Sequence, residues 1–358
     1  MNDLIIIGGG PAGTSAAITA ARNGARVLIL EHGRFPRHKV CGEFVSAESL
    51  GLLKSLLPDT RLVDHAERIS EARIFLDSRQ LHARVHPPAA SISRFDLDLA
   101  LWQAAEQAGA DVRLQTPVQR LAGNGPFIIE TAGGAFEARS VINASGRWSS
   151  LSPRPALPQK WLGIKAHFHE ASPPCSVDLY FFNSGYCGVQ PIGNDLINVS
   201  AMVRADAATT LPAVLSLHPA LAARSRRWQH ATEPVTTSPL FFRRPEPLRD
   251  NMLMAGDTAG FVDPFVGDGI ALALRTGAAA AQCLCTFLRG ETSLPAAGLA
   301  YQRLYRQSFL PIFRNAARYR RLLSLPGVLR APFVRLLART GLPAFLVRST
   351  RGAAGASE

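Results

Sequence analysis

The sequence predicts an α/β protein with a helix-flanked parallel sheet, an antiparallel sheet and a helical C-terminal region. Three observations favour this fold class. The chain opens with a strand, glycine turn, helix and strand; its middle alternates apolar and polar residues in short runs; and after residue 291 apolar residues recur at three and four spacings. With 358 residues, 47% of them hydrophobic, the chain can fill a core of this size.

The N-terminal unit is DLIIIGGGPAGTSAAITAARNGARVLILE, at residues 3–31. It predicts a strand at residues 4–7, a helix at 11–23 and a strand at 26–30. The turn carries GxGxxG, whose glycines permit a tight turn, close approach of backbone to a diphosphate, and close helix-to-strand packing. The helix start adds free N–H groups, and Glu31 is placed to accept hydrogen bonds from a ribose. The unit predicts a Rossmann-like site for either NAD or FAD.

A second motif, LMAGDTAGFVDPFVGDGIALALRTG at residues 253–277, decides between these cofactors. It predicts a short strand ending at Gly256, a carboxylate at Asp257, a glycine-rich loop, and an Ala-rich helix starting near Gly269. A carboxylate after a strand can bind a polyol hydroxyl, and a helix N-terminus can stabilise an anionic ring. FAD offers both groups, in its ribityl chain and its isoalloxazine. The motif therefore favours FAD.

The order and form of these motifs resemble the geranylgeranyl reductase family of FAD-dependent oxidoreductases. The PxxKxCG element of that family is matched by PRHKVCGE at residues 36–43, and its arginine-then-FD helix by ISRFDLDLALWQAAEQAGADV at 92–112. SVINASG, at residues 140–146, resembles the strand that closes the FAD domain. The resemblance covers about residues 1–150 and 250–280.

The resemblance implies which residues surround FAD. They are Gly8, Gly10, Pro11, Ala12, Gly13, Glu31, Arg34, Cys41, Gly42, Arg94, Val118, Ala144, Gly146, Gly256, Asp257, Pro264, Gly267, Gly269 and Ile270. Val118 would offer its backbone to the adenine. The sequence departs from the related aromatic hydroxylases, because Gly260 replaces their histidine and Ser145-Gly146 stands for their DG pair.

Cys41 is the predicted catalytic residue. The resemblance places its loop beside the flavin ring, where a thiol can donate a proton, pack on the ring or guard the substrate side. The alternative is a buried cysteine that acts as a small hydrophobe. Lys39 could lower the thiol pKa or pair with phosphate, and Glu43 and Ser46 are expected to face the site.

The stretches at residues 161–171 and 176–203 predict the antiparallel sheet, with a hairpin turn at GND, residues 193–195. Val177, Leu179 and Phe181 are expected on one side of it, followed by Tyr186 and Val189. The predicted substrate pocket contains His167, Tyr186, Cys187 and Val189. Gly188 stands where the family has a tryptophan, so substrate identity does not follow from the resemblance.

The predicted FAD-binding domain is discontinuous, at residues 1–75, 95–155 and 245–290. The antiparallel-sheet substrate domain takes residues 76–94 and 156–244, a helical cap takes 291–350, and 351–358 form a disordered tail. Of 39 basic residues only four are lysines, and no Asp or Glu occurs from Thr292 to Ser357. The arginines there suggest either a solvated cap over the substrate pocket or peripheral attachment to an anionic membrane. No nucleic-acid motif accompanies the charge.

The predicted function is that of a cytoplasmic FAD-dependent oxidoreductase, which could lie on the inner face of the membrane. The sequence has one GxGxxG, so NADH or NADPH would bind transiently, or a redox partner would reduce the flavin. The favoured reaction is double-bond reduction of an apolar isoprenoid or polyketide-like substrate. The alternatives are a monooxygenase that hydroxylates an aromatic or polyketide substrate, and a non-redox isomerase or cyclase. No metal site is predicted, because the five cysteines lack the paired spacing of zinc or iron-sulfur sites.

Overall fold

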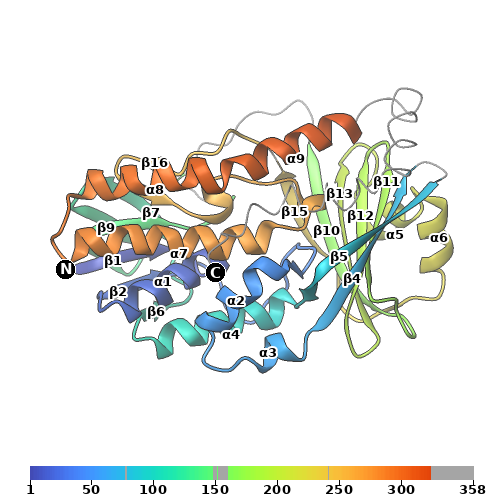
Figure 1. Cartoon of the computed structure of the whole chain (residues 1–358), viewed down its shortest axis with the longest axis horizontal. Coiled ribbons are helices and arrows are strands. Elements are labelled where there is room, and N and C mark those ends of the chain that lie inside the picture. Colours follow the sequence, from blue (N-terminus) through green and yellow to red (C-terminus); the bar gives the residue numbers. More distant parts are fainter. Residues whose placement is uncertain (77–78, 148–150, 152–159, 241, 324–358) are drawn as a thin grey trace.

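The computed structural model describes residues 1–76, 79–147, 151, 160–240 and 242–323. Figure 1 shows two sheets at opposite ends of an elongated molecule, with most helices gathered around the first sheet. Within these described ranges the first, sheet A, has eight strands, and the second, sheet B, has nine. The predicted fold class is confirmed.

Sheet A has a parallel centre in the order β17-β9-β1-β2-β6. The strands are β1 (Asn2–Ile7), β2 (Val27–Leu30), β6 (Asp111–Arg113), β9 (Gly134–Asn143) and β17 (Met252–Met254), with β7 (Val118–Gly123), β8 (Phe127–Thr131) and β16 (Leu248–Arg249) at the periphery. Continuous apolar runs in β1 and β2 are buried, as expected for parallel strands covered on both faces. Residues 253–254 pair with residues 142–143, so the second FAD segment joins the same sheet as the first.

Helices α1 (Pro11–Arg22) and α7 (Gly269–Leu288) cross in close contact. A Cβ added at Gly277 of α7 would lie 2.0 Å from the carbonyl oxygen of Ala12 in α1. The hydroxyl of Ser15 also donates to the carbonyl of Leu274 at 2.8 Å. The two motifs that the sequence separates by more than 200 residues are therefore held together by direct helix packing.

The remaining helices surround this pair. They are α2 (Ala47–Leu56), α3 (Arg61–Asp64), α4 (Arg94–Gln107), α8 (Leu294–Ser308) and α9 (Leu310–Leu323). By length and apolar composition α7 could cross a membrane, but 67% of its most apolar window is buried within the fold. It is packed as a core helix, with α1 on one side and α8 on another.

Sheet B follows the order β14-β10-β13-β12-β11-β4-β5-β3, with β15 also pairing with β10. Its strands are β3 (Phe44–Val45), β4 (Glu67–Leu76), β5 (Arg79–Ser91), β10 (Trp161–His169), β11 (Ser176–Phe182), β12 (Gly185–Gly193), β13 (Leu196–Arg204), β14 (Gln229–His230) and β15 (Val235–Leu240). All pairs are antiparallel except β4 with β11. The predicted GND turn joins β12 to β13, where Asn194 and Asp195 both have a φ of 55°.

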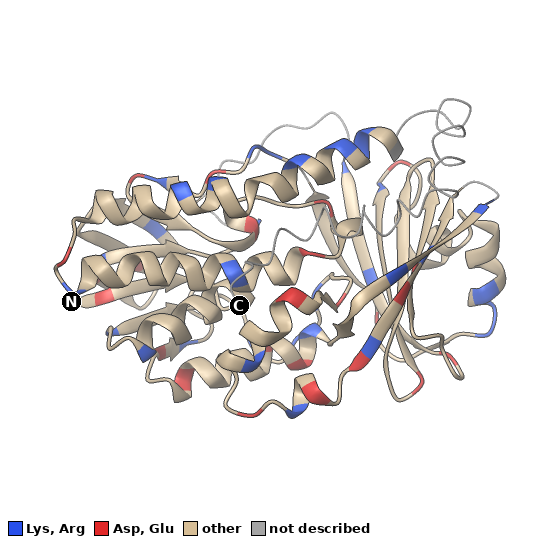
Figure 2. Ribbon diagram, viewed as in Figure 1, with Lys and Arg blue, Asp and Glu red and all other residues tan. Residues whose placement is uncertain are grey.

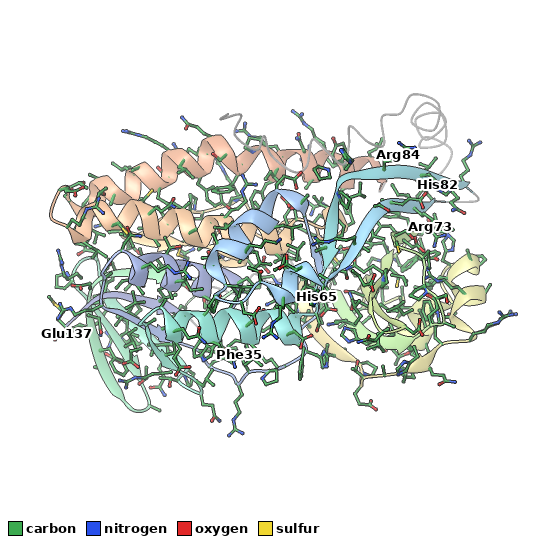
Figure 3. The ribbon with its side chains drawn as sticks, turned by 60° about the horizontal axis from the view of Figure 1, so that its bottom comes forward. Phe35, His65, Arg73, His82, Arg84 and Glu137 are labelled. Carbon is green, nitrogen blue, oxygen red and sulfur yellow. The ribbon has the colours of Figure 1, made fainter. Side chains whose placement is uncertain are left out.

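The edge of sheet B corrects one predicted boundary. The predicted FAD-binding domain includes β4 up to residue 75, but β4 pairs with β5 from Glu67 to Leu76 and with β11 from Glu71 to Leu76. In β5 exposed and buried residues alternate, and the exposed set includes His82 and Arg84, which Figure 3 places with Arg73 of β4 on this ribbon. β4 therefore belongs to sheet B from Glu67 onward, and β3 (Phe44–Val45) joins the same sheet through β5. Strand pairing, which the sequence does not show, makes these assignments.

The outer face of sheet B is covered by α5 (Leu211–Leu215) and α6 (Pro219–Ser225). Arg224 of α6 donates to both carboxylate oxygens of Glu170, at 2.8 and 2.6 Å, and at 2.5 Å to the buried Asp178. Arg73 of β4 completes the pairing of Asp178 from the neighbouring strand. This network ties the helices to the sheet and leaves the inner face free to form a cavity.

The helical C-terminal region is present in α8 and α9, and Pro311 lies at the start of α9, as a helix-starting proline often does. The rest of the predicted cap and the predicted tail at 351–358 lie outside the described residues.

Candidate active site

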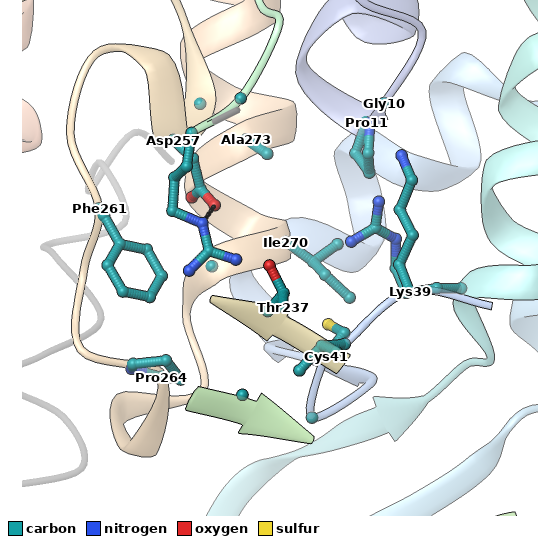
Figure 4. Close-up of a pocket in the computed structure, with 18 of the residues that line it drawn as sticks. Gly10, Pro11, Lys39, Cys41, Thr237, Asp257, Phe261, Pro264, Ile270 and Ala273 are labelled. Atoms are coloured by element: carbon teal, nitrogen blue, oxygen red, sulfur yellow. Dashed lines mark ion pairs between the residues drawn. The ribbon is translucent and has the colours of Figure 1, made fainter. Parts of the chain in front are cut away.

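A cavity of about 510 Å³ lies where sheet A, α1 and α7 meet the inner face of sheet B. Four chain segments from the predicted FAD motifs reach it, at residues 8–12, 31–44, 144–147 and 256–273. Figure 4 shows Gly10, Pro11 and Lys39 on one side, Asp257 and Phe261 on the other, and Cys41 and Thr237 near the middle.

The nucleotide end is built by the first glycine motif. Gly8 has a φ of 103°, a conformation that favours glycine. A Cβ at Gly13 would lie 1.8 Å from the carbonyl oxygen of Gly8, so Gly13 permits close packing of the helix on the turn. Gly13 does not line the cavity. Beside Gly10 a Cβ would meet nothing nearer than 3.9 Å, at Nζ of Lys39. Among the described residues, no side chain caps the start of α1. Its free N–H groups and the open space before them fit a diphosphate.

Glu31 closes β2 as predicted. It accepts hydrogen bonds from the backbone N–H of Gly9 at 2.7 Å and of Gly33 at 2.8 Å, and from Arg37 at 2.8 Å. Burial raises the pKa of Glu31, but the hydrogen bond with His32 and the charge of Lys39 outweigh it and hold the pKa well below its ordinary value. An ionised carboxylate at this end fits a ribose hydroxyl donor.

The opposite end is built by the second motif. Gly256 has a φ of 59° and Gly267 of 76°, and between them Asp257 lies in the short 3-10 turn Gly256–Thr258. The N–H of Gly146 donates to the hydroxyl of Thr258 at 2.7 Å, which joins this turn to the end of β9. A Cβ at Gly269 would meet nothing within 4 Å, so the start of α7 faces open space. This cradle fits the ring end of FAD, with a helix N-terminus directed at it.

Cys41 lies on the loop between these two ends. Its sulfur accepts from the N–H of Glu43 at 3.3 Å, and its carbonyl accepts from the side chain of Asn198 in β13 at 3.0 Å. Lys39 pairs with Asp98 of α4 at 3.3 Å, the same carboxylate that holds Arg94 in a bidentate pair. The structure thus places Lys39 in an ion pair with α4, and brings Cys41 into the cavity.

Glu43 is the centre of a buried charged cluster that anchors this loop to sheet B. It is 0% exposed, and its φ of 59° is rare for a non-glycine residue. One carboxylate oxygen lies 2.8 Å from Nε2 of His167, and the other accepts from Lys165 and, at 2.7 Å, from the N–H of Arg94. Burial raises the pKa of Glu43, but His167 and Lys165 outweigh it and hold the pKa below its ordinary value.

His38 extends the cluster into the cavity. Its ring stands edge-on to that of His167, with 5.1 Å between centroids, and burial and the charge of Lys165 lower the pKa of His38. His167 was predicted in the substrate pocket, but it lies behind Glu43, which itself lines the cavity. Lys165 and His38 were missed. The sequence does carry a signal for Lys165, since residues 165 and 167 alternate along one strand and share a face.

The cavity has an apolar wall formed by Tyr186, Met202, Leu240 and Phe261, which pack together as one buried cluster. Tyr186 was predicted and the other three were missed. Cys187 and Val189 were both predicted in the pocket, and Val189 also on the same side of the sheet as Tyr186, but neither residue lines the cavity. Residues 187 and 189 have the opposite parity to 186, so their side chains pack with α5 and α6 on the outer face. Burial raises the pKa of the Cys187 thiol to about 12.

Most of the residues predicted to surround FAD line this cavity, and Gly13, Arg34 and Val118 do not. Arg34 is exposed, and Val118 is buried in the core of sheet A. Other lining residues that the sequence did not indicate are Arg147, which directly follows the ASG motif, and Gly163, Ser200 and Ala201 from β10 and β13.

Asp263 lies behind the loop that closes this wall. It is 3% exposed, and burial raises its pKa to about 7 despite the charge of Arg320 of α9, 3.7 Å away. Arg320 also stands 3.8 Å over the ring of Phe242. The last described helix therefore contacts the loop that borders the cavity.

Comparisons with known proteins agree with this geometry. A family model described as FAD dependent oxidoreductase matches residues 37–283, and a second model with that description matches residues 3–52. The chain belongs to the FAD-dependent oxidoreductase family. The family supports FAD as the cofactor, which the cradle fits, and an oxidoreductase as the kind of enzyme.

Among curated relatives, the chain is 26% identical over 360 residues to the menaquinone reductase of Mycolicibacterium smegmatis, covering 92% of this chain and 86% of the relative. It is 30% identical over 306 residues to a digeranylgeranylglycerophospholipid reductase of Methanoculleus marisnigri, covering 78% of this chain and 75% of the relative. These relatives confirm the resemblance to geranylgeranyl reductases.

Two solved structures show the same fold. A geranylgeranyl bacteriochlorophyll reductase-like protein of Thermoplasma acidophilum has a TM-score of 0.76 at 22% identity, covering 97% of this chain and 95% of its own. A flavin-dependent brominase has a TM-score of 0.80 at 18% identity, covering 99% of this chain and 94% of its own. Because a reductase-like protein and a brominase share this fold, the fold does not identify the reaction, which has to be inferred from the site.

Proposed function

We propose that this protein is an FAD-dependent reductase that saturates a carbon–carbon double bond of an apolar, isoprenoid-like substrate. The observation that carries the proposal is that Cys41 lines one cavity together with the FAD cradle and the apolar wall of Tyr186, Leu240 and Phe261. A proton-bearing thiol, a redox cofactor and a dry surface for hydrocarbon would then meet at one place.

The names of the curated relatives support this proposal. One is a menaquinone reductase and the other a digeranylgeranylglycerophospholipid reductase. We propose that the substrate here has a similar isoprenoid character. The electrons would come from NADH, from NADPH or from a redox partner.

The chain's own residues would supply binding, a proton and the exclusion of water. FAD, when bound and in its reduced form, would supply a hydride, which carries two electrons. Cys41 would hold the proton for the second carbon at Sγ, and the N–H of Glu43, 3.3 Å from that sulfur, would stabilise the thiolate left behind. Tyr186, Met202 and Phe261 would keep water from this end of the cavity.

The first prediction tests this reaction. The purified protein, reduced anaerobically with NADPH or dithionite and mixed with a geranylgeranyl lipid or a menaquinone, should yield product with two added hydrogens per double bond. Cys41→Ser, with a far less acidic hydroxyl, should lower the rate by about 100-fold or more while flavin content stays at the wild-type level. Mass spectrometry of the product and flavin absorbance measure the two quantities.

Cys175→Ser is the matched control, because Cys175 is exposed and does not line the cavity. Its rate should equal that of the wild type. A product that appears only with oxygen and carries one added oxygen atom would contradict the reductase and support a monooxygenase. Rearranged product without consumption of reductant would support an isomerase or cyclase.

We also propose that the protein works at the cytoplasmic surface of a membrane, where such a substrate resides. The exposed face of α8 and α9 carries Arg303, Arg306, Arg314, Arg318 and Arg321, and the sequence from 292 to 323 has no acidic residue. In Figure 2 blue segments, which mark Lys and Arg, recur along the ribbon of the C-terminal helices α8 and α9. Such a face matches the negative potential of anionic lipid.

The second prediction tests this attachment. The protein should sediment with vesicles that contain phosphatidylglycerol and not with phosphatidylcholine vesicles. The triple variant Arg303→Gln, Arg306→Gln, Arg314→Gln should bind the anionic vesicles on the order of 100-fold more weakly. Equal binding to both vesicle types, or binding unchanged in the variant, would overturn the proposal.

A further inference from the structure

Arg147 is a cavity residue that neither motif accounts for. It directly follows the ASG motif at the end of β9, and only 14% of its side chain is exposed. Its Nε lies 3.3 Å from a carboxylate oxygen of Asp257, the ion pair drawn as a dashed line in Figure 4. Its guanidinium carbon stands 4.1 Å from the centre of the Phe261 ring. The side chain therefore lies between Asp257 and Phe261, the member of the second motif that belongs to the apolar wall.

The described residues do not fill the hydrogen-bonding capacity of Arg147. Its Nη1 is buried and has no hydrogen-bond partner within the part of the chain that the structure describes. A guanidinium has five N–H donors, and a buried donor left unpaired is unfavourable. The side chain of Asp257 is 35% exposed, and it contacts the guanidinium of Arg147 at Nε, not at Nη1. Burial lowers the pKa of Arg147, and the charge of Asp257 raises it without cancelling the effect of burial. This direction agrees with a buried cation whose charge is only partly balanced by its neighbours.

The other two arginines that line the cavity differ from Arg147. Arg94 makes a bidentate pair with Asp98, at 2.7 and 2.8 Å, and Arg37 donates to Glu31 at 2.8 Å. Arg94 and Arg37 both lie near the nucleotide end of the cavity, beside the segment that fits a diphosphate. Arg147 stands at the other end, where Phe261 belongs to the buried cluster of Tyr186, Met202 and Leu240. The missing partner is thus expected beside the apolar wall.

We propose that Arg147 holds an oxygen-bearing head group of the substrate, through Nη1, while the apolar chain lies along Phe261 and Leu240. The inference rests on the proposed function and narrows its substrate class. The substrate would be an amphiphile with a carbonyl or anionic oxygen at one end, such as a prenylated quinone, and a pure hydrocarbon polyene would lack the contact.

The test compares two probes that differ only in oxygen. One is a naphthoquinone carrying a chain of two isoprene units, and the other is the same chain on naphthalene. Dissociation constants come from changes in the flavin absorbance of the oxidised holoenzyme, so no turnover is needed. Arg147→Met should weaken binding of the quinone probe by about 10-fold to 100-fold and leave the naphthalene probe unchanged. Arg147→Lys should recover part of the loss.

Three outcomes would overturn the inference. The wild type binds the quinone no tighter than the naphthalene; or Arg147→Met weakens both probes equally; or Arg147→Met loses its flavin, which would make Arg147 a cofactor ligand. Unfolding by urea checks that Arg147→Met folds as the wild type does. The reductase activity is tested by other measurements, the formation of saturated product and the rate of Cys41→Ser. A failure of head-group recognition would therefore leave the proposed reaction unaffected.

Discussion

Gly277→Ala should destabilise the protein by about 3 kcal/mol and lower its flavin content per chain. The added Cβ would lie 2.0 Å from the carbonyl oxygen of Ala12 and 2.9 Å from its carbon, both backbone atoms that no rotamer change can move. α7 would have to retreat from α1, and with it the start of α7 at Gly269 would leave the cradle. Urea unfolding measures the free energy, and absorbance of the purified protein measures bound flavin.

Gly51→Ala is the matched control for this change. Gly51 is also inside a helix, α2, but a Cβ there would meet nothing within 4 Å. Since alanine is the better helix former, this variant should be as stable as the wild type or more stable by about 1 kcal/mol, with unchanged flavin content. If Gly277→Ala behaved like Gly51→Ala, the close crossing of the two helices would not hold the cofactor segments together.

Glu43→Gln should cost about 3 to 5 kcal/mol of unfolding free energy, because it leaves the buried ammonium of Lys165 without its carboxylate. Lys165 is 1% exposed and Glu43 0% exposed, so water cannot replace the lost partner. The loop that carries Cys41 is anchored through the same carboxylate, and reduction activity should fall together with stability. Urea unfolding at pH 7 measures the first effect and product formation the second.

The pH dependence follows from the direction of the shift. The pKa of Glu43 is lower in the folded state than in the unfolded state, where it is about 4.3. Such a carboxyl stabilises the fold at a pH above its unfolded pKa. This contribution is lost as the pH falls through the folded pKa. The stability gap between wild type and Glu43→Gln should therefore be full at pH 7 and shrink below about pH 4.

A double variant separates the buried charge from other effects. Glu43→Gln combined with Lys165→Met removes both members of the pair and should recover most of the stability, because no uncompensated cation remains. If Glu43→Gln alone stays within about 1 kcal/mol of the wild type, the cluster is not the anchor that its geometry indicates.

Much of the FAD-binding half could be predicted because its signals are local. A strand, a glycine turn and a helix lie within about 30 consecutive residues, and the order of motifs is preserved along the chain. The substrate side was predicted less well. Val189 was expected beside Tyr186, but it lies three positions further along β12. An odd offset puts the two side chains on opposite faces of the strand. The membership of β4 in sheet B depends on pairing with β11, about 100 residues away, which no local pattern reveals.

By itself the sequence determined the fold class and the cofactor, since these depend on residue types at short, regular spacings. The place of Cys41 beside the cofactor site followed from the resemblance to the geranylgeranyl reductase family. Only the tertiary structure decided which charges meet. Glu43, Lys165 and His167 come together because β10 folds onto the Cys41 loop. Arg147 is buried because Asp257 and Phe261 close around it, and within the described residues its Nη1 has no hydrogen-bond partner. Burial and partnership depend on contacts between distant segments, and it is these that set the chemistry of a charged group.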